Sequence, residues 1–486
     1  MAEALRAGRG HAAATAMPTR EARPYPSASL FAACGVLALA AGAGLLAETA
    51  DPLPFGLQHL SGPTLAISLS APLICLIWPE LALPVIIIGA ELLDREFGGG
   101  RVRHLVFMKL ALLIFAAVGV LLKTWGQGGR MPRVKTPADV PAVLLAGYTA
   151  LSAAYAYLVV GRDLDLVAVA GYHLSQLALY HFLVTTTLGR EQAFRRAGLI
   201  VVGRALLMVV PSILGGGRHG GTGTTWLIVL LCYALLQRTN WGVLAWVALP
   251  LAMLDTVTCG FRTLWVTVGG QLAWLALAGI WLRLHRLAAV AVFVLVAGLG
   301  GVFLALGHPG LLAGVPSAVT LDRYQGGMLV GGYRVPEAVI GIESALEHPL
   351  LGQGMGYQTQ LRWVQTMGNM AVGPIHHIYY VSYLSNEGLV GLALVLWYFG
   401  AVLFSRPARQ LRRLAAVEPW AAVALGLQAA FFGAILGAFL SGPPDGHWTW
   451  GMFGAASLLP ATWIASRPAG GGTRRAWARP PYNGAG

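Results

Sequence analysis

Charged residues are scarce in this chain. Only 11% of its 486 residues are Asp, Glu, Lys or Arg, whereas 56% are hydrophobic, and the mean hydropathy is +0.66. Soluble domains carry about 25% charged residues, so this balance excludes an ordinary soluble protein. Apolar runs of roughly 20 residues, the length that crosses a bilayer as a helix, recur along almost the whole chain. We therefore predict an integral membrane protein.

Acidic residues are the rarer charged kind, with 20 Asp and Glu against 33 Lys and Arg, which gives a net charge of +13. Such an excess can indicate nucleic-acid binding. Here, however, the arginines stand in short patches between apolar runs, as the positive-inside rule predicts for loops of a membrane protein. We expect membrane lipids as partners and no nucleic acid.

Cysteines are few and internal repeats are not evident. The four cysteines lie in or at the ends of apolar runs without a CxxC pair, so we expect small apolar residues rather than a metal cluster or a disulfide framework. The lack of a repeat argues against the inverted-repeat architecture of secondary transporters. The cysteines are Cys34, Cys75, Cys232 and Cys259.

The apolar runs are continuous and do not alternate with a period of two, which predicts helices and not a barrel. We expect an all-α, polytopic transmembrane helical bundle of about 12–14 spans. Segment 64–93 is either two spans or one helix kinked at Pro84. The predicted spans are 28–47, 64–78, 81–93, 104–122, 139–160, 164–185, 198–216, 225–237, 241–259, 263–281, 287–307, 377–404, 419–441 and 446–465.

Basic loops orient the chain around one long connection. With the N-terminus in the cytoplasm, most basic loops and the Arg-rich C-terminal tail fall on the cytoplasmic side, and the long connection falls outside. Loops of that length are usually functional. The expected organisation is a disordered basic cytosolic leader (1–27), N-terminal transmembrane helices (28–307), a long extracytoplasmic loop with short helices (308–376), three C-terminal transmembrane helices (377–465) and a cytosolic tail (466–486).

The middle of the long loop, residues 336–348, has apolar residues at helical spacing. We predict a short amphipathic helix on the membrane surface, with Arg334 just before it. The following PLLGQGMG, residues 349–356, predicts a tight glycine turn that brings the chain back towards the bilayer. The apolar positions of the predicted helix are Val339, Ile342 and Leu346.

Two arginines, Arg262 and Arg334, and a histidine pair, His376 and His377, are predicted at the same outer face. Each arginine alone is compatible with a side chain that snorkels to the interface, and the histidines with ordinary interfacial residues. Their convergence favours a functional site. A guanidinium binds phosphate oxygens in bidentate fashion, and imidazole is the natural general base near neutral pH.

Further ionisable residues are predicted inside spans. Such residues are functional candidates by default, so we expect them to line a lipid groove, although Arg204 and Asp255 are equally suited to pair across helices. His173 and His181 are about two helical turns apart and are able to share a face. Together they form a second tier of candidates: His173, His181, Arg204 and Asp255.

The stretch HIYYVSYLSNEGLVG, residues 377–391, resembles the motif H-N-x-Y-L-x-x-L-x-E-x-G-x-x-G of the O-antigen ligase and O-antigen polymerase superfamily. Aligned on Gly388 and Gly391, the motif histidine is His377 and the tyrosine is Tyr380. Leu384 matches the second leucine of the motif. The sequence departs from the motif at Ile378, which replaces the asparagine, and at Asn386, which occupies the acidic position so that Glu387 follows one residue later.

The upstream segments also resemble this superfamily. Its members commonly have an arginine about 15 residues before P-L-L-G-x-G, the position of Arg334 here, with Ala338 at a position that is usually tryptophan. A Ser-Arg pair usually stands at the outer end of an earlier helix, and here Arg262 follows Phe261 in place of the serine. The resemblance covers roughly residues 200–400.

The resemblance implies a GT-C-like membrane glycosyltransferase of the bacterial inner membrane with its active site facing the periplasm. In the superfamily, the two arginines hold the diphosphate of an undecaprenyl-diphosphate-linked glycan, and the histidine deprotonates the acceptor hydroxyl. Transfer inverts the anomeric carbon and needs no metal and no cofactor. We accordingly expect surface roles for Asp322, Glu343 and Glu347.

Three activities stay open at the sequence level. An O-antigen ligase transfers the glycan to lipid A-core in lipopolysaccharide biosynthesis, and the motifs lean slightly towards it. A polymerase transfers the glycan to a second lipid-linked glycan with the same donor chemistry. A transporter or flippase for lipid-linked oligosaccharides would use the arginines for binding alone.

Overall fold

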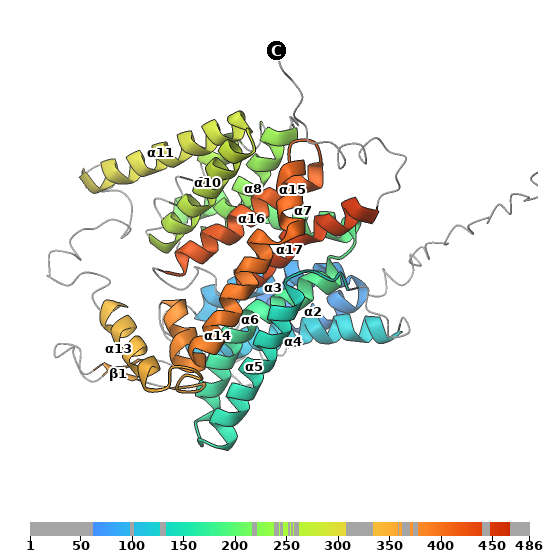
Figure 1. The fold of residues 1–486 in the computed structure, drawn as a ribbon. Helices are drawn as coiled ribbons and strands as arrows, with labels where there is room; N and C mark the ends of the chain where they lie inside the picture. The colour runs from blue at the N-terminus through green and yellow to red at the C-terminus, as the bar shows by residue number, and fades with distance from the viewer. Residues whose placement is uncertain are drawn as a thin grey trace, which may run out of the picture.

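The computed structural model describes residues 62–97, 102–126, 133–215, 221–237, 262–307, 334–357, 359–361, 370–372, 378–439 and 448–466, with the short pieces 243, 246–250, 253 and 256. Over these ranges the chain is almost entirely helical, which confirms the predicted class (Figure 1). The strands of the described ranges, β1 (Thr359–Leu361) and β2 (Met370–Val372), pair as one antiparallel ribbon.

The helices follow the apolar runs of the sequence to within a few residues at most ends. The predicted spans 28–47 and most of 241–259 lie outside the described residues. The described helices are α2 (Gly62–Ile77), η2 (Pro79–Leu81), α3 (Ala82–Phe97), α4 (Val102–Gly126), α5 (Asp139–Leu158), α6 (Leu164–Thr187), α7 (Glu191–Gly215), α8 (Gly221–Gln237), α10 (Arg262–Trp281), α11 (His285–Gly307), α13 (Arg334–Glu347), α14 (Tyr379–Phe404), α15 (Arg406–Leu414), α16 (Pro419–Gly437) and α17 (Trp448–Ser466).

Segment 64–93 forms two helices, as the first of the two predictions stated. The break lies at Trp78, whose φ of −126° and ψ of 82° are not helical, and the residue before a proline generally avoids the helical region. Pro79 then opens the short helix η2. Pro84 lies in the first turn of α3, where a proline needs no hydrogen-bond partner for its nitrogen, so it causes no kink.

Several helices are suited to a membrane. Among the described residues, five helices are long and apolar enough to cross a bilayer. They support a multi-pass membrane protein, and the total of 12–14 spans stays a prediction. The five are Asp139–Leu158, Leu166–Thr187, Thr263–Trp281, Tyr379–Leu414 and Pro419–Gly437.

The core is built where α6, α14, α16 and α17 meet. Trp450 is fully buried there, and its ring centroid lies 5.0 Å from that of Phe399 and 6.5 Å from that of Tyr383. Glycines allow close helix contacts, as is usual in membrane bundles. A Cβ at Gly451 of α17 would lie 2.2 Å from the carbonyl oxygen of Leu177 in α6.

Contacts between distant loops define two ends of the bundle. At one end, which we call the basic end, the Trp463 indole donates to the Gly189 carbonyl, and the Gln237 amide donates to the Ala415 carbonyl. Helices α5 and α6 both reach this end, where Val134 N–H donates to the Thr185 carbonyl. Arginines Arg190, Arg195, Arg196, Arg406, Arg409, Arg412 and Arg413 lie in the loops and helix ends gathered there.

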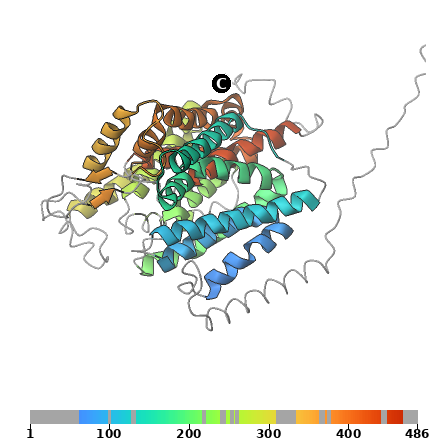
Figure 2. The same ribbon diagram turned by 90° about the horizontal axis from the view of Figure 1, so that it is seen from below.

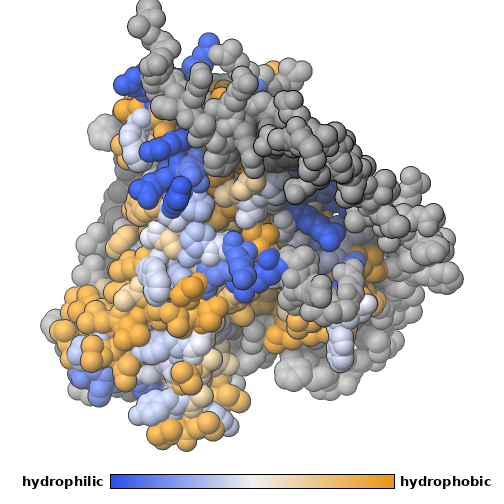
Figure 3. Space-filling view, turned by 45° about the vertical axis from the view of Figure 1, so that its right-hand side comes forward, coloured by the Kyte–Doolittle hydropathy of each residue, from blue (hydrophilic) through white to orange (hydrophobic). Residues whose placement is uncertain are grey.

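At the other end, which we call the turn end, the connection between α5 and α6 meets residues 349–356, the glycine turn. Figure 2 shows α2 and α4 side by side on one edge of the molecule and α13 on another, beside α14. In Figure 3 apolar side chains cover the lower part of the visible face, at the height of the lower end of α5 in Figure 1. The exposed apolar residues of that part of α5 include Leu151, Tyr155 and Leu158.

Candidate functional site

Helix starts coincide with the residues that the sequence singles out. α10 begins at Arg262, α13 begins at Arg334, and α14 begins at Tyr379, two residues after His377. The first N–H groups of a helix lack intrahelical partners and carry partial positive charge, so each start favours an anion. His376, His377 and Asp255 lie outside the described residues.

The starts of α10 and α14 contact the same turn of α16. The Tyr380 hydroxyl donates to the Ile435 carbonyl at 2.8 Å, and the Tyr380 ring lies 4.2 Å from that of Phe439. A Cβ at Gly437 would lie 3.4 Å from the carbonyl oxygen of Thr263, the residue after Arg262. The last turn of α16 therefore brings the backbone at Arg262 and the beginning of α14 to one level of the bundle.

α14 is broken at Gly388, where φ is 65° and ψ is −162°. The glycine turn supplies hydrogen bonds on both sides of the break. Gln353 N–H donates to the Ser385 carbonyl at 2.7 Å, and Gly354 N–H donates to the Asn386 carbonyl at 3.0 Å. After the break, the N–H groups of the next two residues donate to the carbonyls of Pro349 and Leu350. The turn thus replaces hydrogen bonds that an unbroken helix would make internally.

Close backbone contact explains why two of these positions are glycine. A Cβ at Gly388 would lie 2.4 Å from the Leu350 carbonyl oxygen, and one at Gly352, where φ is 72°, would lie 2.6 Å from the Gly388 nitrogen. Neither position has room for a side chain, and positive φ values disfavour L-residues. The PLLG segment and the E-G segment, which the sequence shows separately, form one backbone joint.

Arg162, in the connection between α5 and α6, clamps the glycine turn. Its Nη2 donates to the Gln353 carbonyl at 2.6 Å, and its Nη1 donates to the carbonyls of Gly354 and Met355 at 3.0 and 3.3 Å. The guanidinium carbon also lies 5.1 Å from the centroid of the Tyr357 ring. Burial lowers the pKa of Arg162 from its usual value, although a guanidinium stays charged at neutral pH.

A buried carboxylate ties the break to α5. Glu387 is 0% exposed, its Oε1 accepts from the Thr149 hydroxyl at 2.6 Å, and its backbone carbonyl accepts from the Tyr148 hydroxyl at 2.9 Å. A Cβ at Gly391 would lie 2.5 Å from Glu387 Oε2, so this glycine leaves room for the carboxylate. The motif residues Glu387, Gly388 and Gly391 therefore all serve the joint between α14, α5 and the glycine turn.

α13 also ends at the glycine turn. The Gln353 side-chain amide donates to the Ser344 carbonyl at 2.9 Å and to Glu347 Oε2 at 2.7 Å. α13 packs beside α14, and both α13 and the first part of α14 run towards the turn (Figure 1). Their starts, at Arg334 and Tyr379, consequently lie on the same side of it.

The apolar face of α13 points away from the bundle. Val339, Ile342 and Leu346 are 47%, 43% and 71% exposed, whereas the opposite face buries Ala345. Leu350 in the following turn is 64% exposed. This helix matches the prediction for residues 336–348 with small shifts at its ends. The exposed apolar face supports its placement against a membrane surface.

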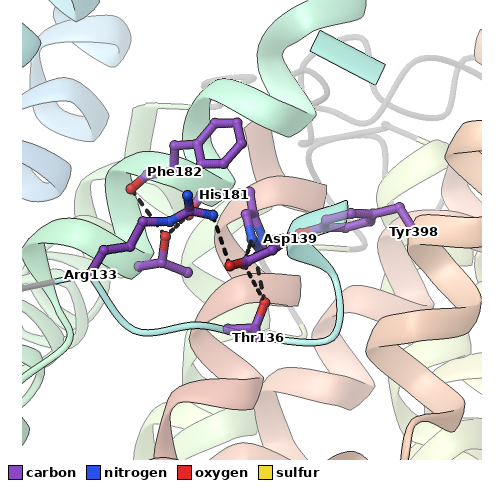
Figure 4. Close-up of polar contacts among 7 residues, drawn as sticks. Arg133, Thr136, Asp139, His181, Phe182 and Tyr398 are labelled. Atoms are coloured by element: carbon purple, nitrogen blue, oxygen red, sulfur yellow. Dashed lines mark hydrogen bonds and ion pairs between the residues drawn. The ribbon is translucent and has the colours of Figure 1, made fainter. Parts of the chain in front are cut away.

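Figure 4 shows a polar network at the basic end, built from α5, α6, α14 and the segment before α5. His181 is 0% exposed, with Nε2 2.8 Å from Asp139 Oδ1 and Nδ1 3.0 Å from the Tyr398 hydroxyl. Asp139 also forms an ion pair with Arg133 at 2.9 Å and accepts from the Thr136 hydroxyl at 2.8 Å. His181 faces the protein interior, so the prediction that it lines a lipid groove is wrong.

The remaining predicted residues do not gather at one place. His173 is half-buried and makes an edge contact with the Tyr172 ring, with centroids 5.5 Å apart. Arg204 is half-buried in α7, and the suggested pairing with Asp255 involves a residue outside the described ranges. The surface positions expected for Glu343 and Glu347 are confirmed, while Asp322 is not described. Cys75 and Cys232 are buried and free, as predicted.

Sequence reasoning missed Arg162 and the role of Glu387. Arg162 is a lone arginine in a short connection, and its sequence context does not distinguish it from arginines that only determine the membrane topology. Glu387 appeared only as a motif acid displaced by one residue. The signal for both was the glycines at 352 and 388, whose positive φ values and close backbone contacts leave no room for a side chain.

Comparison of the chain with models of protein families, with curated proteins and with solved structures finds no match.

Proposed function

We propose that this protein is an inverting membrane glycosyltransferase that moves a glycan from undecaprenyl diphosphate to an acceptor hydroxyl. The observation that carries the proposal is the position of the helix starts. The starts at Arg262 and after His377 both lie against the last turn of α16, and α13, which starts at Arg334, ends at the glycine turn beside α14. Helix starts and arginines both favour phosphate groups.

The proposed reaction follows from these groups. His377 takes the proton of the acceptor hydroxyl, whose oxygen then attacks the anomeric carbon of the donor. The bond from that carbon to the diphosphate breaks, and the undecaprenyl diphosphate leaves with the electron pair. Arg262 and Arg334 stabilise the negative charge that develops on the leaving diphosphate. Attack opposite the leaving group inverts the anomeric carbon.

The exposed apolar face of α13 supports a lipid-linked donor. The face of Val339, Ile342 and Leu346 suits the interface of a bilayer, with Arg334 at the start of the same helix. A diphosphate near Arg334 would thus be at headgroup level while its polyprenyl chain stays in the bilayer. We propose the outer face of a bacterial inner membrane as the location and a GT-C-like arrangement as the fold.

A transfer assay with purified protein in nanodiscs tests the proposal and separates its versions. The donor is undecaprenyl-diphosphate glycan, and the acceptor is lipid A-core or a second donor molecule. Product on lipid A-core is expected for the ligase that we favour, and a ladder of lipid-linked chains would identify a polymerase. Donor binding without either product would contradict glycosyl transfer and favour a transporter. Transfer should continue in EDTA, and a strict need for added Mg²⁺ would contradict the metal-free mechanism.

Donor binding tests the two arginines. Arg262→Ala and Arg334→Ala should each weaken donor affinity about 10- to 100-fold, because each removes a charge-assisted contact worth roughly 1.5–3 kcal/mol. Lysine at either site should restore only part of the donor affinity, since an ammonium group cannot bind two phosphate oxygens with the bidentate geometry of a guanidinium. Arg409→Ala, an exposed site at the basic end, is the matched control and should bind donor normally. Full rescue by lysine would contradict the diphosphate clamp.

A further inference from the structure

A cavity of about 390 Å³ lies between α7, α8, α16 and α17, away from the glycine turn. Most of its lining is apolar, with contributions from Phe194, Val201, Trp226 and Met452. Its volume lies within the range of roughly 300–1,000 Å³ that is typical of small-molecule sites. The proposed transfer reaction does not use it.

The depth of the cavity matches one leaflet. On α7 its lining runs from Glu191, at the basic end, to Val202. At 1.5 Å per residue this is about 16 Å, close to half of the roughly 30 Å hydrocarbon core. An acyl chain that entered from the basic end would therefore reach about the middle of the bilayer.

Aromatic side chains stand at the end of the cavity nearest the basic end, which we call its mouth. The Trp420 indole donates to Glu191 Oε1 at 2.6 Å, and its ring lies 5.7 Å from Phe194 and 5.4 Å from Trp463. Tryptophan is enriched at the level of lipid headgroups. This cluster therefore places the mouth at the bilayer interface and the lining beyond it in the hydrocarbon region.

The charge at the mouth is positive. Arg195 lines the cavity and is exposed, and Arg190 is exposed nearby, while the neighbouring Arg196 lies 3.2 Å from Glu80 as an ion pair. The Glu191 carboxylate accepts a hydrogen bond from the Trp420 indole and offsets one of these charges, which leaves an excess of one positive charge. An anionic headgroup at this mouth would meet two exposed guanidinium groups, which bind phosphate well.

We propose that this cavity binds one acyl chain of an anionic phospholipid from the leaflet at the basic end, with its phosphate at Arg195. The lipid fills the space between α7 and the pair α16 and α17. This site lies at the opposite end of the bundle from the proposed diphosphate site, and it stands independently of the glycosyltransferase proposal.

Photolabelling tests the site. The full-length protein is placed in nanodiscs with phosphatidylglycerol or phosphatidylcholine that carries a photoreactive group on one acyl chain, and labelled peptides are mapped by mass spectrometry. We expect the phosphatidylglycerol probe to label the lining segments of α7 and α17 and to exceed the phosphatidylcholine probe there. Equal labelling of these segments by the two probes would overturn the proposal.

A plug variant and its control sharpen the test. Gly198 lines the cavity, and a Cβ there would meet nothing within 4 Å, so Gly198→Leu is the substitution chosen to place a side chain in the cavity. Gly203, on the same helix, is equally open but does not line the cavity. Labelling should fall about tenfold in Gly198→Leu, the equivalent of roughly two lost methylene contacts, and stay unchanged in Gly203→Leu. Equal labelling in the two variants would contradict a site here.

A charge variant tests the headgroup. Arg195→Glu should reduce labelling by phosphatidylglycerol several-fold while leaving the phosphatidylcholine signal unchanged. Arg409→Glu makes the same charge change at an exposed site of the basic end outside the cavity lining and should change neither signal. A loss in both arginine variants would show general surface electrostatics and would overturn the assigned headgroup position.

Discussion

The two ends of the bundle hold the same helices together by different means. At the turn end, α14 is broken at Gly388, and backbone groups of the glycine turn complete its hydrogen bonds. At the basic end α14 is intact, and side chains make the connection, with His181 between Asp139 and Tyr398. Where backbones pack this closely, there is no space for an added side chain, so the glycines allow almost no substitution. A side-chain network can lose one hydrogen-bond partner while the helices keep their geometry. The turn end is therefore the end built to fix a loop in place.

The largest effect is expected from adding one methyl group at the break. Gly388→Ala would place a Cβ 2.4 Å from the Leu350 carbonyl oxygen at a positive φ, so the joint must open or distort. We expect a loss of roughly 3 kcal/mol or more in unfolding free energy. Thermal unfolding in detergent measures it. Gly400→Ala, in the same helix with open space around it, is the control, and similar losses in both variants would refute the backbone joint.

Removing the arginine clamp should have the next largest effect. Arg162→Ala leaves the carbonyls of Gln353, Gly354 and Met355 without their donor, at an expected cost of about 2–3 kcal/mol. Lysine should recover part of this, because it reaches fewer of the three acceptors at once. Hydrogen exchange of the 349–357 segment provides a local readout. Unchanged exchange in Arg162→Ala would mean that the turn does not depend on the clamp.

The smallest effect is expected at the basic end. Asp139→Asn removes the charge opposite Arg133 but keeps a side chain able to accept from His181, so we expect a loss of only about 1–2 kcal/mol. Thermal unfolding again provides the measurement. A loss larger than that of Gly388→Ala would reverse the comparison between the two ends.

The sequence predicted elements better than it predicted contacts. Runs such as 287–307 became helices with nearly the same ends, because length and hydropathy alone determine a span. The glycine turn at 349–356 was likewise predictable from its glycines. Its partner was not, since the hydrogen bond from Val390 to Leu350 joins residues 40 apart through tertiary packing.

Side-chain direction was the other weak point. In α6 the polar residues are spread around the helix, so no single polar face distinguishes the lipid side from the interior, and the orientation of His181 could not be read from its spacing. The sequence predicted only part of the arrangement of helix starts at Arg262 and Arg334. The sequence indicated a helix after Arg334, but it did not show that the last turn of α16 would support the starts of both α10 and α14.

The most direct test of the account compares single-turnover transfer rates of His377→Ala and Asp139→Asn in nanodiscs, each normalised to folded protein. The account predicts that His377→Ala lowers the rate about 10²- to 10⁴-fold, the usual contribution of a general base, while donor binding persists. Asp139→Asn should keep the wild-type rate, because its network ties helices at the opposite end. Near-normal transfer by His377→Ala would contradict the central claim.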